Sequence, residues 1–338
     1  MTDQTASKSA AAPAPPASPR ERGHWANVWA QFRSHRGALM GSAVFLFICA
    51  MVLFGPYIWT VDPGYQDFRA RNMRHILACF SLPWGDVANC FLNPSEMVSI
   101  NVTWAHPLGT DNIGRDTLAR LLFGGRISMA VGLTAMGIAL FLGTLVGVLA
   151  GYFKRIDGLL MRTTDLFLAL PLLPLLLLMV LLFREPLSAA FGTEGGIFIL
   201  IVTGIGITSW MPTARIVRGD VLALKEREFV LAARSIGTRP GRMILRHVLP
   251  NVMSPIMVSA TLGIASAIIT ESALSFLGLG FPPDFPTWGR LLNDGVQYMQ
   301  QYPERVVWPG LLISVVVLAV NYVGDGLRDA LDPRIRGR

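Results

Sequence analysis

The sequence predicts an all-α integral membrane protein with six transmembrane helices, and three observations lead to this fold class. The chain of 338 residues is 52% hydrophobic and only 15% charged, outside the usual range of soluble domains. Six apolar stretches have about the length that a helix needs to cross a hydrocarbon core of ~30 Å. Of the 29 Lys and Arg, 20 fall on the side that holds both termini, which makes this side cytoplasmic.

The N-terminal part is expected to lie outside the membrane. Residues 1–24 are rich in Ala, Pro and Ser, so a disordered cytoplasmic tail is predicted there. In 25–38, Trp25, Val28 and Phe32 recur at helical spacing. This pattern predicts an amphipathic helix on the inner membrane surface, or else an ordinary flank of the first span.

The six spans follow from the positions of the apolar stretches. They are predicted at Leu39–Trp59, Met129–Tyr152, Leu166–Phe183, Ile197–Val217, Val252–Leu277 and Val306–Val323. Pro171 and Pro174 interrupt the third stretch. This arrangement places a loop over 60–128 on the outer side, a five-span core over 129–327 and a cytoplasmic tail over 328–338.

The outer loop contains two of the three cysteines, Cys79 and Cys90. A disulfide between them is permitted if that compartment oxidises thiols, and the alternative is two free buried thiols. No metal site is predicted in the loop, because nearby His75 has no recognisable ligand spacing around it.

One acidic residue, Glu271, falls deep in a predicted span. A carboxylate at mid-bilayer costs about 2.5–3.5 kcal/mol on insertion scales, so its presence needs a reason. Packing against another helix or lining a water-filled translocation path are the favoured interpretations. A transporter driven by an ion gradient would instead use such a residue as an ion or proton site.

A polar segment over 220–251 separates two apolar stretches and carries six Lys or Arg. We expect Asp220 to cap a helix that ends at Gly237, since glycine readily adopts the left-handed conformation found at helix ends. Pro240 is expected to open a second short helix that Pro250 closes.

Small side chains at Ala232 and Ala233 would let another surface approach the backbone of this segment closely. Such a basic, partly amphipathic loop between spans indicates a docking site for a partner. The Arg residues at 215, 218, 234, 239, 242 and 246 are expected to pair with an acidic partner surface or with lipid headgroups.

Several function classes lack their motifs in this chain. Its three lysines, Lys8, Lys154 and Lys225, stand outside any Gly-Lys-Ser/Thr sequence, so no phosphate-binding loop is present. No zinc-protease or hydrolase signature occurs. We therefore expect a non-catalytic chain without a cofactor of its own, and the basic balance indicates membrane topology instead of nucleic-acid binding.

The polar segment resembles the EAA loop of permeases in binding-protein-dependent ABC importers. The residues that carry the resemblance, and that are expected to dock an ATPase, are Ala232, Ala233, Arg234, Gly237, Leu249 and Pro250. Leu231 stands where the family usually has Glu, and His247 where an aliphatic residue is usual.

Three further blocks resemble the oligopeptide, dipeptide and nickel branch of this family. They are His106–Asp111 with Gly114–Asp116, Glu271–Gly280 with Trp288–Gly289, and Gly324–Pro333. Their order is similar to that of the second permease of such systems.

This resemblance implies a type I ABC importer permease fold in a bacterial inner membrane, with a cytoplasmic coupling helix and both termini cytoplasmic. It also implies a second permease subunit, two ABC ATPase subunits that bind ATP and Mg, and a periplasmic solute-binding protein. The implied solute is a di- or oligopeptide, with nickel chelate, glutathione or oligosaccharide as alternatives. An ion-coupled secondary transporter is the alternative from another class.

Overall fold

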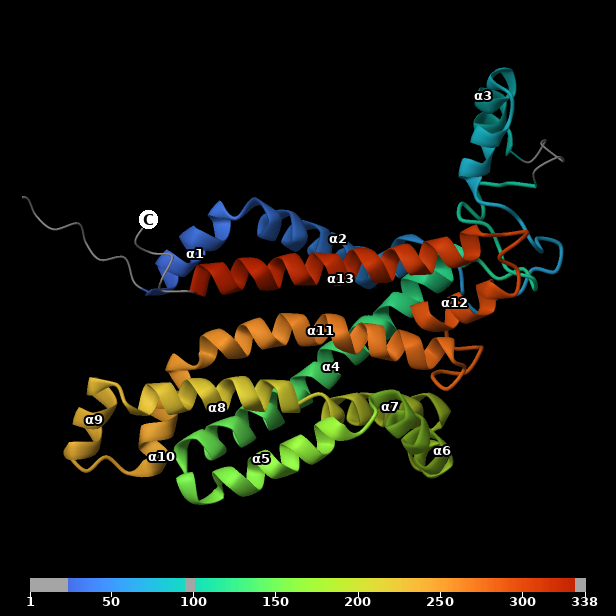
Figure 1. Cartoon of the computed structure of the whole chain (residues 1–338). Coiled ribbons are helices and arrows are strands. Elements are labelled where there is room, and N and C mark those ends of the chain that lie inside the picture. Colours follow the sequence, from blue (N-terminus) through green and yellow to red (C-terminus); the bar gives the residue numbers. More distant parts are fainter. Residues whose placement is uncertain (1–23, 95–100, 332–338) are drawn as a thin grey trace, which may run out of the picture.

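The computed structural model describes residues 24–94 and 101–331, which form a bundle of long helices (Figure 1). The predicted tail over 1–24 falls outside the described residues apart from its last residue, and so does 332–338. Six helical stretches in the described part are long and apolar enough to cross a membrane, which agrees with the predicted number. They are Arg36–Ile58, Thr117–Tyr152, Leu172–Phe191, Thr193–Lys225, Met253–Phe276 and Glu304–Leu331.

The helical elements follow one another along the chain with short connections, except between α2 and α4 and between α11 and α12. In order they are α1 His24–Ser34, α2 Arg36–Ile58, η1 Ile76–Ser81, α3 Trp84–Leu92, α4 Thr117–Tyr152, α5 Lys154–Ala169, α6 Leu172–Phe191, α7 Thr193–Thr208, α8 Met211–Lys225, α9 Glu228–Ser235, α10 Pro240–Met243, η3 Ile244–Val248, η4 Leu249–Asn251, α11 Met253–Phe276, α12 Trp288–Val296 and α13 Glu304–Leu331.

The long helices share one approximate direction, and α4 crosses the bundle obliquely (Figure 1). Helices α9 and α10 lie beyond one end of the bundle, and α3 stands away from the other end (Figure 1). Helix α1 lies at the same end as α9, next to the last turn of α13 (Figure 1). The two ends of the described chain therefore lie on one side of the predicted membrane.

The predicted N-terminal helix over 25–38 is a separate element that packs on the chain itself. Val28 and Phe32 of α1 are buried in a cluster with Ala330 and Leu331 of α13. His35 separates α1 from α2, because its Nδ1 accepts a hydrogen bond from the backbone N–H of Ala38 at 3.0 Å. The inward face of α1 is thus covered by protein instead of lipid.

Helix α4 begins at Thr117, well before the predicted start of the second span at Met129. Asp116 caps this helix: its Oδ1 accepts hydrogen bonds from the backbone N–H of Ala119 at 2.6 Å and from Nε1 of Trp59 at 3.1 Å. The end of the predicted outer loop over 60–128 is therefore the first part of a long helix.

The position of Arg126 within α4 has a local explanation. Pro56 in α2 has no N–H to donate to the carbonyl of Val52 four residues earlier. Nε of Arg126 donates to that carbonyl at 3.0 Å instead, and its Nη2 donates to the carbonyl of Leu53 at 2.6 Å. The arginine thus replaces the donor that Pro56 lacks and also binds the next carbonyl along the helix.

Two predicted spans are interrupted by helix breaks. The third, predicted over Leu166–Phe183, crosses the break between α5 and α6 at Leu170 and Pro171. The fourth, predicted over Ile197–Val217, crosses the break between α7 and α8 at Ser209 and Trp210.

Small residues allow α4 and α8 to approach each other closely. Gly143, Gly147 and Gly151 recur every four residues on one face of α4. A Cβ atom at Gly143 would lie 2.7 Å from the carbonyl of Trp210, just before α8, and one at Gly147 would lie 2.7 Å from a carbonyl within α8. One at Gly151 would lie 2.7 Å from the side chain of Val221. Larger side chains would therefore force the helices apart.

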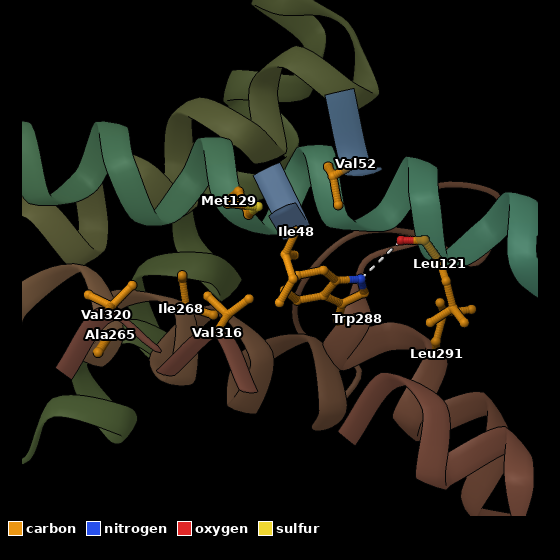
Figure 2. Close-up of a cluster of buried hydrophobic side chains, with 10 residues drawn as sticks. All are labelled: Ile48, Val52, Leu121, Met129, Ala265, Ile268, Trp288, Leu291, Val316 and Val320. Atoms are coloured by element: carbon orange, nitrogen blue, oxygen red, sulfur yellow. Dashed lines mark hydrogen bonds between the residues drawn. The ribbon is translucent and has the colours of Figure 1, made fainter. Parts of the chain in front are cut away.

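A second tight junction surrounds Trp288, the first residue of α12 (Figure 2). Its indole ring is fully buried in a cluster drawn from α2, α4, α11, α12 and α13. Nε1 of Trp288 donates to the carbonyl of Leu121 at 3.0 Å, as the dashed line in Figure 2 shows. This hydrogen bond satisfies the polar atom of a ring that otherwise contributes only apolar burial.

Candidate functional site

The candidate site is the segment from the end of α8 to the start of α11. Asp220 does not cap a helix there, contrary to the sequence prediction, because it lies inside α8. Val217 and Val221, on either side of Asp220 in the sequence, are completely buried against the rest of the bundle. Their packing stabilises the helix beyond Asp220. The helix ends at Lys225, whose Nζ donates to the carbonyls of Gly151 and Tyr152 at 3.2 and 3.0 Å. This contact fastens the end of α8 to the end of α4.

Helix α9 turns one face to the protein and the other to solvent. Val230 and Ala233 face inward and are 3% and 8% exposed. They join a cluster that includes Val148, Met243 and Val248, so the second half of the segment packs beneath the first. The segment is therefore a folded unit with a small apolar core.

Other apolar residues of this region are exposed to solvent. Phe229 and Ala232 of α9 and Ile236, which directly follows the helix, recur at helical spacing and are all exposed. We call these three residues the docking face. Ile236 is 84% exposed and Phe229 is 45% exposed. An exposed apolar face on a short helix outside the bundle indicates a surface for a partner.

Gly237 ends this helix in the way its sequence position predicts. Its φ is +79°, in the left-handed region. Its N–H donates to the carbonyl of Arg234 at 3.0 Å, and the N–H of Thr238 donates to that of Ala233 at 3.2 Å. This pair of bonds is a Schellman motif, which fixes the direction in which the chain leaves α9.

The second half of the segment is helical but irregular. Pro240 opens α10 as predicted. Pro250 does not close a helix, because the chain continues through the wide turn η3 and the tight turn η4 into α11. Leu249 is half-buried against the same core as Val230, and Pro250 is exposed.

Two of the arginines that were expected to pair with a partner surface or with lipid headgroups are engaged within the chain. Arg218 binds Asp157 of α5 through two hydrogen bonds, and Arg215 binds Asp165 through one. The arginines at 234, 239, 242 and 246 are exposed at the surface of the segment. These four arginines make the solvent-facing surface of the segment basic.

A cleft of about 630 Å³ separates α9 and α10 from the junction of α4 and α5. Its wall mixes charges of both signs with apolar residues, including Lys154, Glu226, Leu231 and Arg234. The segment thus has an exposed apolar face next to a cleft that is lined by charged and apolar residues.

Glu271 lies elsewhere, in α11, and its side chain is completely buried. Its Oε1 accepts a hydrogen bond from the hydroxyl of Ser275 at 2.7 Å, and Ser128 of α4 and Thr287 before α12 lie next to it. In this conformation the carboxyl group packs between helices and faces no open path.

Cys79 and Cys90 are joined in a disulfide between η1 and α3. The bond holds α3 against η1 on the outlying part of the structure (Figure 1). Around it, Phe80, Phe91 and Trp104 form a chain of aromatic contacts.

The sequence matches a family described as "Binding-protein-dependent transport system inner membrane component" over residues 121–337. The chain belongs to this family. A second match, over residues 23–78, is to the N-terminal transmembrane domain of oligopeptide transport permease C.

Curated relatives of this permease extend the similarity to most of the chain. The oligopeptide transport system permease protein OppC of Bacillus subtilis is 35% identical over 92% of this chain and 90% of its own length. The dipeptide transport system permease protein DppC of Alkalihalophilus pseudofirmus is 34% identical over the same shares of the two chains. A structure of the MetNI methionine ABC transporter in an inward-facing conformation covers 62% of this chain and 94% of its own, with 18% identity and a TM-score of 0.49.

The sequence alone did not reveal three features of this permease's site. The exposed side chains of Phe229 and Ile236 follow from the inward packing of Val230. The bond from Lys225 to the end of α4 joins residues far apart in the chain. The ion pair of Arg218 with Asp157 also joins residues far apart in the chain, and the only sign of it in the sequence is their opposite charge.

Proposed function

We propose that this chain is the transmembrane permease subunit of an ATP-driven importer that moves di- or oligopeptides across the bacterial inner membrane. The folded segment α9–α10 is the single observation that supports this best. It is a rigid unit with an exposed apolar docking face, fastened to the spans by Lys225 and Arg218. Relatives over most of the chain are named as oligopeptide and dipeptide permeases.

In this proposal the chain pairs with a second permease, and two ABC ATPase subunits bind the cytoplasmic side. ATP and Mg are held by the ATPases, and a periplasmic binding protein delivers the solute. Closure of the ATPases pushes on the docking face, and α8 and α11 carry the movement into the spans. The requirement is stiffness, which the Schellman turn at Gly237 and the core around Val230 supply.

The orientation follows from the distribution of basic residues. The end of the bundle that holds α1, α9 and the last turn of α13 is the side with most Lys and Arg (Figure 1). This side is cytoplasmic under the positive-inside rule. The disulfide between Cys79 and Cys90 then lies on the periplasmic side, where disulfides persist.

Peptide uptake by cells that express the whole transporter tests the function. Labelled dipeptide should accumulate in cells with the chain and not in cells without it. Depletion of ATP should stop accumulation while the ion gradients are maintained by an external supply. Uptake that follows the proton or sodium gradient and ignores ATP would refute the proposal in favour of a secondary transporter.

A further inference from the structure

A cavity of about 370 Å³ lies about halfway along the spans, within the range of small-ligand sites. Met136, near the middle of α4, and Gly263, near the middle of α11, form part of its wall. The rest comes from the two helix breaks, at Leu170 between α5 and α6 and at Ser209 between α7 and α8. Two interrupted helices therefore meet at one hollow.

The breaks leave backbone acceptors beside this cavity. Pro174 has no N–H to donate to the carbonyl of Leu170, and Pro212 has none for the carbonyl of Thr208. Both Leu170 and Thr208 belong to the cavity wall. A carbonyl without its helical donor can accept a hydrogen bond from a ligand or from water.

The wall also contains hydroxyl groups but no ionisable side chain. Ser209, Thr213, Ser259 and Ser266 contribute hydroxyls, each of which can both donate and accept. Thr208 adds a fifth hydroxyl, which donates to the carbonyl of Gly204 at 2.7 Å, and the other lining side chains are apolar. Such a wall complements an amide chain, whose N–H groups need acceptors and whose carbonyls need donors.

We infer that this cavity holds the main chain of the transported peptide during its passage, and that it does not select among peptide side chains. The inference rests on the proposed function and adds the site and its chemistry. Because the wall has no fixed charge, it neither attracts nor repels acidic or basic side chains specifically. Exposed Ile216 and Leu262 border the cavity, so a second permease can complete it from outside.

Ser266 provides the test, since it lines the cavity, is exposed, and bonds only to the carbonyl of Leu262 within its own helix, at 3.1 Å. Ser266→Asp and Ser266→Arg introduce opposite charges, and Ser266→Asn is the neutral control of the same size as Asp. The complete transporter with its binding protein is reconstituted in vesicles. Uptake of the tripeptides Ala-Glu-Ala and Ala-Lys-Ala is then measured with ATP inside or outside as the orientation requires.

The ratio of the two uptake rates is the readout, because a general loss of folding or coupling changes both rates together. We expect the wild type and Ser266→Asn to share one ratio. Ser266→Asp should shift it toward the Lys peptide by about tenfold, and Ser266→Arg should shift it the other way, given the strength of charge interactions at low dielectric. Equal ratios in all four proteins would overturn the inference.

A second measurement covers the case in which a charged variant fails to insert. Ser266→Cys, in a chain whose Cys49 is replaced by Ala, is labelled with a small thiol reagent while the transporter turns over. Saturating peptide should slow labelling several-fold, and labelling that peptide leaves unchanged would contradict the inference. A wild-type transporter without ATP-driven peptide uptake would instead refute the proposed function itself, and the peptide cavity with it.

Discussion

Arg218 of α8 and Asp157 of α5 form a two-point ion pair, with Nε to Oδ1 at 2.5 Å and Nη2 to Oδ2 at 2.7 Å. These hydrogen bonds hold the pKa of the Asp157 carboxyl below its ordinary value. The pair joins α8, which leads into α9, to α5, which follows α4. It therefore holds α8, the helix that leads into α9, in place against α5.

Arg218→Lys should weaken this connection, because a lysine ammonium cannot form the parallel pair of bonds that a guanidinium forms. We expect fewer peptides to be imported per ATP hydrolysed, with the amount of protein in the membrane unchanged. Arg215→Lys is the matched control, since Arg215 and Asp165 are both more than half exposed and make one contact. An equal effect of both substitutions would contradict the role given to Arg218.

The six spans were predictable because apolar stretches of sufficient length are a strong signal in sequence. The residues at which the spans begin and end were harder to predict. The start of α4 depends on the cap at Asp116, which sits among loop residues. The breaks near Pro171 and Pro212 are marked by the prolines, but the sequence did not show that both face one cavity.

In the segment from the end of α8 to the start of α11, local features were likewise predictable from the sequence and long-range contacts were not. Gly237 and Pro240 have local roles that a short stretch of sequence specifies, and both predictions hold in the structure. Asp220 was misassigned because a capping residue and a residue on the polar side of a helix look alike in sequence. Burial of Val221 against α4 decides between them, and that contact is long-range.

On the predicted periplasmic side, Asp111 is the centre of a charge network. Its Oδ2 accepts from Nε of Arg115 at 2.6 Å and from Nη1 of Arg120 at 3.0 Å. Burial alone would raise the pKa of the Asp111 carboxyl. The N–H and guanidinium of Arg115 and the charge of Arg120 outweigh burial and lower this pKa below its ordinary value.

A lowered pKa in the folded state means that Asp111 contributes stability above its unfolded pKa of about 3.9. This contribution is lost as the pH falls through the lower, folded pKa. The network should therefore hold at pH 7 and weaken only below about pH 4. Asp111→Asn should lower the free energy of unfolding at pH 7 by on the order of 3 kcal/mol, because two buried arginines lose their nearest carboxylate and keep only the more distant Asp294.

Thermal unfolding of the purified protein in detergent at pH 7 and pH 3 checks this. The variant should unfold at lower temperature at pH 7 and lose less on acidification than the wild type. Equal unfolding temperatures of the two proteins at pH 7 would contradict the account of Asp111.

Glu271→Gln should be tolerated, since an amide oxygen can still accept the hydroxyl hydrogen bond of Ser275. Glu271→Ala should destabilise the protein by more than about 2 kcal/mol, because it leaves a void and unpaired hydroxyl groups. Unfolding temperature and peptide uptake measured together separate packing from a role in transport. Complete loss of uptake in Glu271→Gln, with a normal unfolding temperature, would show that the carboxyl group itself acts in transport.

The disulfide predicts a specific pattern of thiol reactivity. In the unfolded, unreduced wild type, only Cys49 should be alkylated, and reduction should expose Cys79 and Cys90 as well. Mass spectrometry of peptides before and after reduction measures this. Alkylation of Cys79 without prior reduction, in protein taken directly from the membrane, would contradict the pairing.

We propose that the docking face binds an ATPase. The most direct test is purification of tagged chain from native membranes as wild type, Ile236→Leu and Ile236→Asp. Ile236 is 84% exposed, so neither substitution should disturb folding, but a buried aspartate in an apolar contact would be costly. We predict that wild type and Ile236→Leu recover a second permease and ATPase subunits, whereas Ile236→Asp recovers the permease with little or no ATPase. Equal recovery of ATPase by all three, or its absence from the wild type, would contradict the claim.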